Sequence, residues 1–331
     1  MPLHDAHYQH WDGVHTGIWD RRRVIAQNGL TACLRGKLLR YVVVVSWVSG
    51  LVMAALLFFL GQLLVPDSIL VRGVSQISPG IRSFIGFMTS WLVDHPEVSV
   101  GTTQNVLFYF YAVYSLQTSI VALGMVLPSL ITRDLASNAI VIYSSKAMTR
   151  GDYLLGKFCT AFGLMALTWL APVCGAWFIG NLLAPDWSFF WHSRLALLHI
   201  LMFGLVSLSV LSLLALGVSA VSSREKSTPA LWYSWWVLAW AILPIASHTM
   251  PWLRHVSFFY DLRQIGVAVF RLGRELRTAQ DSIPFVGEML SRGSQEMRDA
   301  LNHPTLAGSF LALALMGLVA GLIIRKRVVP E

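Results

Sequence analysis

Residues 195–221 read LALLHILMFGLVSLSVLSLLALGVSAV and contain no charged side chain. An α-helix needs about 20 mainly apolar residues to cross the hydrocarbon core of a bilayer. The polar groups within the stretch are chiefly small hydroxyls, Ser207, Ser209 and Ser212, which are typical of contacts between packed membrane helices. The stretch therefore predicts a transmembrane helix.

Five further segments are similarly apolar, and their one charged residue is Lys157, near the start of the third span. They cover residues 41–65, 106–131, 154–184, 229–247 and 306–324. Hydrophobic residues make up 55% of the 331-residue chain and charged residues only 13%, against about 25% charged residues in soluble domains. The mean hydropathy is +0.60. The segments must be helices, because barrel strands would alternate between apolar and polar residues. We expect an all-α integral membrane protein with six transmembrane helices.

Basic residues cluster on one side of these spans. Every lysine falls on this side: Lys37, Lys146, Lys157, Lys226 and Lys326. Cytoplasmic loops carry the excess of Lys and Arg in membrane proteins, so we expect both termini in the cytoplasm. Residues 1–40 lack the short apolar core and cleavage site of a secretory signal, so the first span is expected to remain as an anchor. The expected location is the bacterial inner membrane, crossed several times.

Two connections are expected to form helices outside the spans. Residues 24–40 mix apolar residues with Arg and Lys, which indicates an interfacial elbow helix after a cytoplasmic tail. The extracytoplasmic insert 251–304 carries an a/d stripe, and its pattern predicts a helical hairpin whose second helix follows Pro284. The stripe consists of Phe258, Leu262, Ile265, Val269, Leu272 and Leu276. It either packs on this protein or its dimer mate, or docks an extracytoplasmic partner at 255–301.

The segment 132–153 is the most informative connection. It contains Asp134-Leu135, a short apolar stretch at 139–143, and then the run RGDYLLGK at 150–157. This arrangement resembles the permease subunit of type-2 ATP-binding-cassette (ABC) transporters, although Ala147 stands where that family commonly has proline. The motif covers only about 25 residues. The elbow helix, the six spans and the long last outer loop extend the resemblance, as architecture, to most of the chain.

In that family this segment is the coupling helix that inserts into a groove of the ATPase subunit. The resemblance thus implies a coupling role for eight residues. They are Arg133, Asp134, Tyr143, Lys146, Arg150, Asp152, Tyr153 and Lys157. It also implies two partners, a cytoplasmic ABC ATPase and a second permease copy or paralogue, and a membrane-lipid environment. An exporter that works as a dimer is the expected assembly, with no nucleic acid involved.

The start of the third span partly matches the sequence motif of a nucleotide-binding site. Gly151, Gly156 and Lys157 match part of a phosphate-binding loop, but Phe158 replaces the Ser or Thr that would bind magnesium. We therefore expect no cofactor and no catalytic residue in this chain, with ATP and Mg²⁺ bound by the partner ATPase. The chain is then not itself an enzyme.

Two other functions stay open. An integral membrane enzyme would need convergent catalytic side chains, and His199 and His248 have no neighbouring carboxylate or nucleophile. A secondary transporter independent of ATP would usually place ionisable residues at mid-membrane, where these spans have almost none.

The cysteines, Cys33, Cys159 and Cys174, show no metal or disulfide spacing. The N-terminal histidines, His4, His7, His10 and His15, are read as part of a polar tail. The sequence leaves the cargo and the direction of transport open.

Overall fold

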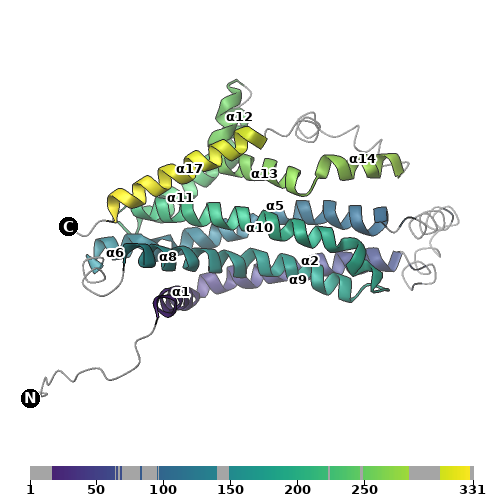
Figure 1. Cartoon of the computed structure of the whole chain (residues 1–331), viewed down its shortest axis with the longest axis horizontal. Coiled ribbons are helices and arrows are strands. Elements are labelled where there is room, and N and C mark those ends of the chain that lie inside the picture. The colour runs from purple at the N-terminus through teal and green to yellow at the C-terminus, as the bar shows by residue number, and fades with distance from the viewer. Residues whose placement is uncertain are drawn as a thin grey trace, which may run out of the picture.

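The computed structural model describes residues 17–63, 65, 68, 83, 95, 97–139, 149–222, 224–246, 249–282 and 306–328. Within these residues the chain is helical and has no strand (Figure 1). Six helices are long and apolar enough to cross a membrane. They are Lys37–Gln62, Val100–Ala136, Arg150–Leu182, Ser188–Val221, Ser227–Ala246 and Leu306–Arg327. In the described residues the predicted all-α architecture is confirmed, with six helices that have the length and apolar character of membrane spans.

Most spans extend beyond the predicted apolar runs, because the polar residues at their ends continue the helix. The second span consists of η1 (Glu97–Thr102), α5 (Thr103–Leu127), η2 (Pro128–Thr132) and α6 (Arg133–Ala136). The third consists of α8 (Arg150–Met165), η3 (Ala166–Leu170) and α9 (Ala171–Leu182). The fifth consists of α11 (Ser227–Val237), η4 (Leu238–Ile242) and α12 (Leu243–Ala246). The segments η1 to η4 are π-helical turns inside these helices.

Three of these wide turns adjoin prolines. The turn η2 begins at Pro128, whereas η3 and η4 each end two residues before a proline, Pro172 and Pro244. A proline ring clashes with the carbonyl four residues earlier. For Pro172 and Pro244 those carbonyls belong to Thr168 and Trp240, which lie inside the π turns. The wide turns therefore let both helices continue across the membrane despite the prolines.

The helix α10 (Ser188–Val221) lies at the centre of the bundle. It packs against α5, α8 and α17 (Leu306–Arg327), while α2 (Lys37–Leu63) packs against α5 and α9. In the apolar 18-residue stretch that identifies α10 as a span, 61% is buried inside the protein. In the corresponding stretch of α17 only 22% is buried. Large apolar side chains remain exposed along α2, α10 and α17, including Leu51, Leu205 and Leu318. These outer surfaces suit contact with lipid.

The expected elbow helix differs in its bounds. A helix was predicted over 24–40, but α1 covers Ile18–Leu34, and a break at Arg35-Gly36 separates it from α2. Glycine is a poor helix former, and its N–H closes the final turn on the Cys33 carbonyl oxygen at 3.1 Å. Figure 1 shows α1 nearly end on, across the direction of the spans, and it packs on α8. Its place at the membrane interface stays a prediction.

The a/d stripe of the insert lies on two helices instead of one. They are α13 (Phe258–Val269) and α14 (Leu272–Ser282), which follow the short 3-10 helix η5 (Pro251–Val256). Arg271, at φ 51°, stands in the left-handed region and ends the continuous helix that the stripe predicted. The stripe residues Phe258, Leu262 and Ile265 are each 1% exposed. Packing on the same chain, one of the two predicted alternatives, therefore accounts for the stripe. The hairpin's second helix falls in 283–305, outside the described residues.

Candidate functional site

Most residues of the predicted coupling segment gather at one end of the bundle. We call this the basic end: α6 ends here, α8 and α11 begin here, and α10 and α17 end here. Arg133, Arg150, Lys157, Arg224 and Arg325 all belong to it. In Figure 1 it is the left-hand end of the bundle, where α6 is labelled.

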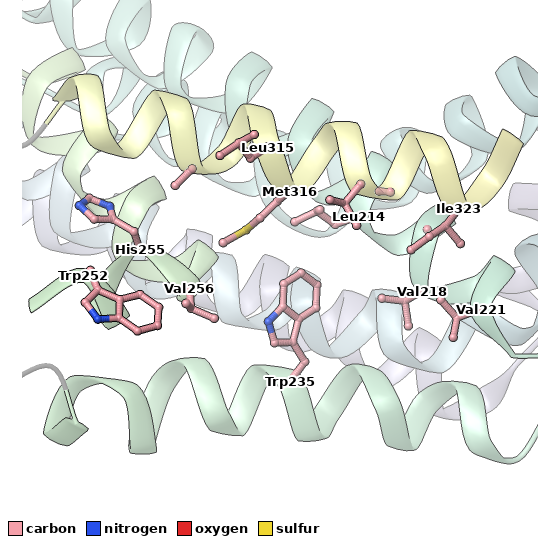
Figure 2. Close-up of a pocket in the computed structure, with 14 residues that line it drawn as sticks. Leu214, Val218, Val221, Trp235, Trp252, His255, Val256, Leu315, Met316 and Ile323 are labelled. Atoms are coloured by element: carbon pink, nitrogen blue, oxygen red, sulfur yellow. The ribbon is translucent and has the colours of Figure 1, made fainter. Parts of the chain in front are cut away.

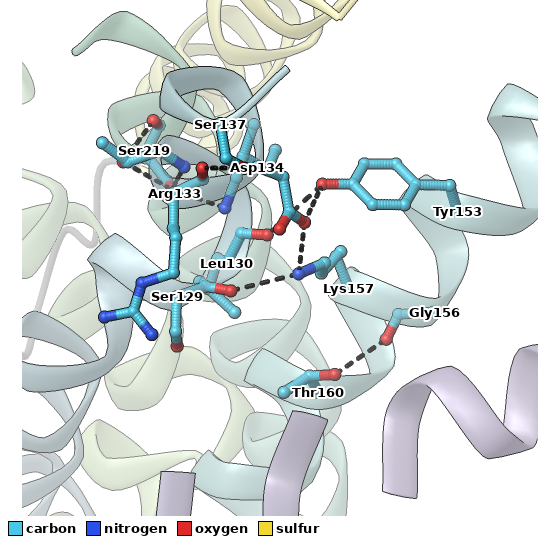
Figure 3. Close-up of polar contacts among 12 residues, drawn as sticks. Ser129, Leu130, Arg133, Asp134, Ser137, Tyr153, Gly156, Lys157, Thr160 and Ser219 are labelled. Carbon is cyan, nitrogen blue, oxygen red and sulfur yellow. Dashed lines mark hydrogen bonds and ion pairs between the residues drawn. The ribbon is translucent and has the colours of Figure 1, made fainter. Parts of the chain in front are cut away.

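Asp134, Tyr153 and Lys157 form a buried polar cluster at this end (Figure 3). The Lys157 Nζ lies 2.7 Å from Asp134 Oδ2, and the Tyr153 hydroxyl donates to the same oxygen at 2.7 Å. Lys157 also donates to the Ser129 carbonyl oxygen at 3.1 Å. The Asp134 and Lys157 side chains are only 14% and 15% exposed. Tyr153 and Lys157 are four residues apart on α8, so one face of this helix holds the last turn of the second span.

A second ion pair at the basic end is exposed. Arg133 Nη2 lies 3.0 Å from Glu225 Oε2, and Arg133 Nε donates to Glu225 Oε1 at 3.3 Å. Hydrogen bonding to the Arg133 guanidinium lowers the pKa of the Glu225 carboxyl. The Arg133 side chain is 60% exposed and the Glu225 side chain is 47% exposed. Exposed pairs contribute little to stability, so its side chains are available for contact with another molecule.

Ser219, near the end of α10, joins that helix to the second span. Its Oγ accepts from the backbone N–H groups of Ile131 and Thr132, at 2.9 and 3.1 Å, and donates to the Leu127 carbonyl oxygen at 2.7 Å. The Thr132 hydroxyl donates in turn to the Ser219 carbonyl oxygen at 2.7 Å. These groups lie in or beside the π turn η2. The serine therefore fixes the end of α5 to the end of α10.

Asp152 and Arg150 have other partners. Asp152 forms a capping box with Thr149 at the start of α8 and an ion pair of 2.6 Å with Arg22 of α1. Arg150 Nη2 donates to the carbonyl oxygens of Ile324 and Arg325, the last turn of α17. A cation at a helix C-terminus is favourable, because its carbonyl groups lack partners within the helix. Both residues thus tie α8 to a neighbouring helix.

The predicted coupling residues therefore separate into groups. Asp134, Tyr153 and Lys157 come together, whereas Arg133, Arg150 and Asp152 each contact a different element. Arg133 and Asp134 lie in the last turn of the second span rather than on a separate coupling helix. Tyr143 and Lys146 lie outside the described residues.

Three residues that take part in this site were not predicted from the sequence: Arg22, Ser219 and Glu225. Glu225 stands alone among basic residues in the connection between spans four and five, and an acid in that position is a signal for pairing. Arg22 is the second of three consecutive arginines, and nothing in the sequence distinguishes it from the other two. No sequence signal distinguishes Ser219 from the other serines of its span.

A separate apolar groove lies between α10, α11, α17 and η5 (Figure 2). We call it the α11–α17 groove. It has a volume of about 490 Å³, and its walls include Leu214, Val218, Trp235, Val256, Met316 and Ile323. His255 lies at one end, and its Nδ1 is 2.7 Å from Asp261 Oδ1. Nowhere in the described part of the chain do three or more His, Cys, Asp or Glu side chains gather as a metal site would require.

Neither a protein-family model nor a curated protein matches this chain.

Proposed function

We propose that this chain is the permease subunit of a transporter driven by a separate cytoplasmic ABC ATPase. Two permease chains, identical or related, would form the path across the inner membrane. The proposal begins from the resemblance of RGDYLLGK at 150–157 to type-2 ABC permeases. The arrangement of the basic end gives it independent physical support.

The observation that carries the proposal is how the coupling segment is attached. The second span ends at Ala136 and the third begins at Arg150, so these two residues bound the segment. Its two attachment points are joined by the ion pair between Asp134 and Lys157. Ser219 connects the first point to α10, and Arg150 connects the second to α17. A force applied to this segment would therefore move the ends of four spans together, as a coupling element requires.

The surface beside these attachment points is polar and accessible. Arg133, Ser137, Asn138, Glu225 and Lys226 are all exposed. Asn138 has φ 54°, a left-handed conformation that asparagine tolerates, and it terminates the helix at this surface. Exposed charges of both signs can pair with complementary charges on an ATPase and orient it.

Site-directed photocrosslinking in native membranes tests the proposal. A photoreactive residue at Asn138 should capture a protein that mass spectrometry identifies as an ABC-type ATPase. The matched position is Trp187, 74% exposed between α9 and α10 at the other end of the bundle, where the same probe should not capture it. Failure to capture an ATPase at 138, or equal capture at both positions, would refute the proposal.

One observation favours a second candidate, a proton-coupled secondary transporter. Asp261 is 0% exposed, and its Oδ2 has no hydrogen-bond partner. Asp261 lies on α13, outside the six candidate spans, so it would take up a proton at the end of a transport path and not at mid-membrane. The two candidates differ for Asp261→Asn, which keeps the shape of the side chain. Transport driven by a proton gradient would be lost in this variant, whereas ATP-driven transport would continue.

A further inference from the structure

The last helix, α17, borders a second groove on its other side. This groove lies between α8, α10 and α17 and has a volume of about 520 Å³. We call it the α8–α17 groove. Leu154, Leu155, Phe158, Leu213, Leu216 and Ile324 supply most of its walls. Its volume falls within the range of about 300–1,000 Å³ that is usual for ligand sites.

Two arginines mark one end of the groove. Arg150 is the first residue of α8, and Arg325 lies in the last turn of α17, so both belong to the basic end. From there the groove runs inward along α8 as far as Phe158. The groove is thus cationic where the spans begin and apolar deeper in.

Neither arginine has an acidic partner among the described residues. The described ion pairs of the basic end use Arg22, Arg133 and Lys157 instead. Arg150 is held in place by two carbonyl oxygens, both bonded to its Nη2, so Nε and Nη1 keep their capacity to donate. Lys326 and Arg327 add further exposed positive charge beside Arg325.

Gly321 lines the α8–α17 groove, and its lack of a side chain leaves space there. A Cβ at this position would meet no atom within 4 Å, so the space beside α17 is open here. By contrast, a Cβ at Gly217 would lie 2.7 Å from the Ala320 Cβ, where α10 and α17 are in direct contact. The open space at Gly321 therefore forms part of the α8–α17 groove, which this glycine lines.

The geometry points to an anionic phospholipid as the occupant of the α8–α17 groove, with its phosphate at Arg150 and Arg325 and an acyl chain along Leu154 and Phe158. Basic sites between membrane helices are suited to such head groups, and arginine binds phosphate through paired N–H groups. This inference requires the six spanning helices but not the ATPase, so it can succeed or fail independently of the proposed function.

Charge disfavours a second copy of the chain as the occupant. Within the six candidate spans, from Lys37–Gln62 to Leu306–Arg327, the acidic residues are Asp134 and Asp152, and each is already paired within its own chain. Glu97 precedes the second of these spans, at the end opposite to the arginines. A second copy packed through its apolar spans would thus leave both arginines without a counter-charge at the membrane surface. A lipid phosphate supplies that charge together with the apolar chain.

The α11–α17 groove offers an internal comparison. It lies on the same helix and has a similar volume, but its lining contains one ionisable residue, His255, and no Arg or Lys (Figure 2). A preference for anionic over zwitterionic lipid should therefore come from the α8–α17 groove alone.

Native mass spectrometry of the purified, delipidated full-length chain tests the inference. The chain is titrated with dioleoyl phosphatidylglycerol or with dioleoyl phosphatidylcholine. We expect the anionic lipid to bind at least tenfold more tightly to one site. Arg325→Gln should remove most of this preference, because its side chain makes no hydrogen bond within the described protein. Gly321→Leu should abolish the site by filling the groove.

Matched controls separate the site from general effects. Lys326→Gln removes an equal charge at the next residue, which does not line the groove, and Ala312→Leu adds the same kind of volume to α17 in the α11–α17 groove. Both should keep the preference, and thermal unfolding should show that all four variants fold.

Three results would overturn the inference. The first is an unchanged preference in Arg325→Gln and Gly321→Leu. The second is displacement of the lipid by millimolar inorganic phosphate, which would indicate a simple anion site. The third is loss of self-association instead of lipid binding in Gly321→Leu, which would indicate an interface between copies.

Discussion

Lys157 of α8 and Asp134 of α6 form a nearly buried ion pair that joins the end of the second span to the start of the third. Tyr153 completes the contact by donating to the same carboxylate oxygen. Removing one partner of a buried pair leaves a charge without compensation, which is more costly than losing the attraction itself.

We predict that Asp134→Ala lowers the free energy of unfolding by about 3 kcal/mol, because Lys157 would remain almost buried and unpaired. The double variant Asp134→Ala/Lys157→Met should recover most of this loss, since it removes the buried charge. Chemical unfolding of the detergent-solubilised chain, followed by tryptophan fluorescence, measures both. If the double variant were as unstable as the sum of the single variants, the pair would not be coupled as described.

The exposed pair of Arg133 and Glu225 should behave differently. Arg133→Glu should change stability little, because exposed pairs contribute little, but it should reduce co-purification with the proposed ATPase partner. The charge exchange Arg133→Glu/Glu225→Arg restores the internal pair while leaving a reversed charge at residue 133. We expect co-purification to stay low in the exchanged variant. Full recovery would mean that Arg133 acts only through Glu225 and makes no contact with the ATPase.

The crossing of α1 and α8 depends on Gly156. A Cβ at this position would lie 2.6 Å from Ile25 Cγ2, so Gly156→Ala should push the two helices apart and cost about 1–3 kcal/mol. Gly163→Ala, on the same helix, is the control, because its Cβ would meet Leu30 Cδ2 at an ordinary 3.8 Å. Thermal unfolding compares the two. Equal effects would show that helix propensity, rather than the crossing, determines the result.

Burial raises the pKa of Asp261 to about 6, chiefly because the carboxylate is desolvated, although His255 and Ser309 oppose the shift. In the unfolded chain an aspartate has a pKa of about 3.9. The folded state therefore holds a proton that the unfolded state releases between about pH 4 and 6, and stability should fall as the pH rises through this window. Because other groups titrate over the same range, this contribution is measured as the difference in melting temperature between the parent and an Asp261→Asn variant from about pH 4 to 7.

The melting temperature of Asp261→Asn should rise relative to that of the parent as the pH increases over this range, whereas Asp20→Asn, at an exposed position of α1, should follow the parent. A constant difference between Asp261→Asn and the parent across this range would contradict the prediction.

The sequence predicts the spans well and the polar contacts poorly, for a physical reason. Uncharged runs such as 195–221 identify the membrane helices because the bilayer imposes a length and a polarity on each one. The contact between Asp134 and Lys157 depends instead on how two helix ends meet in space, which hydropathy does not encode. The helix break at Arg271 is hidden for a similar reason. Both α13 and α14 bury their apolar faces against the bundle, so the stripe continues across the break without a change in pattern.

The close contact between Gly217 and Ala320 has a consequence for how the protein is made. The last span is synthesised after the other five, and it is attached mainly to α10 and α13. In lipid, helices associate through close packing rather than through the hydrophobic effect, and small residues at the contact allow it. Insertion and packing should therefore be separate events for α17: this apolar helix should be stable in the bilayer on its own before it packs against α10 and α13.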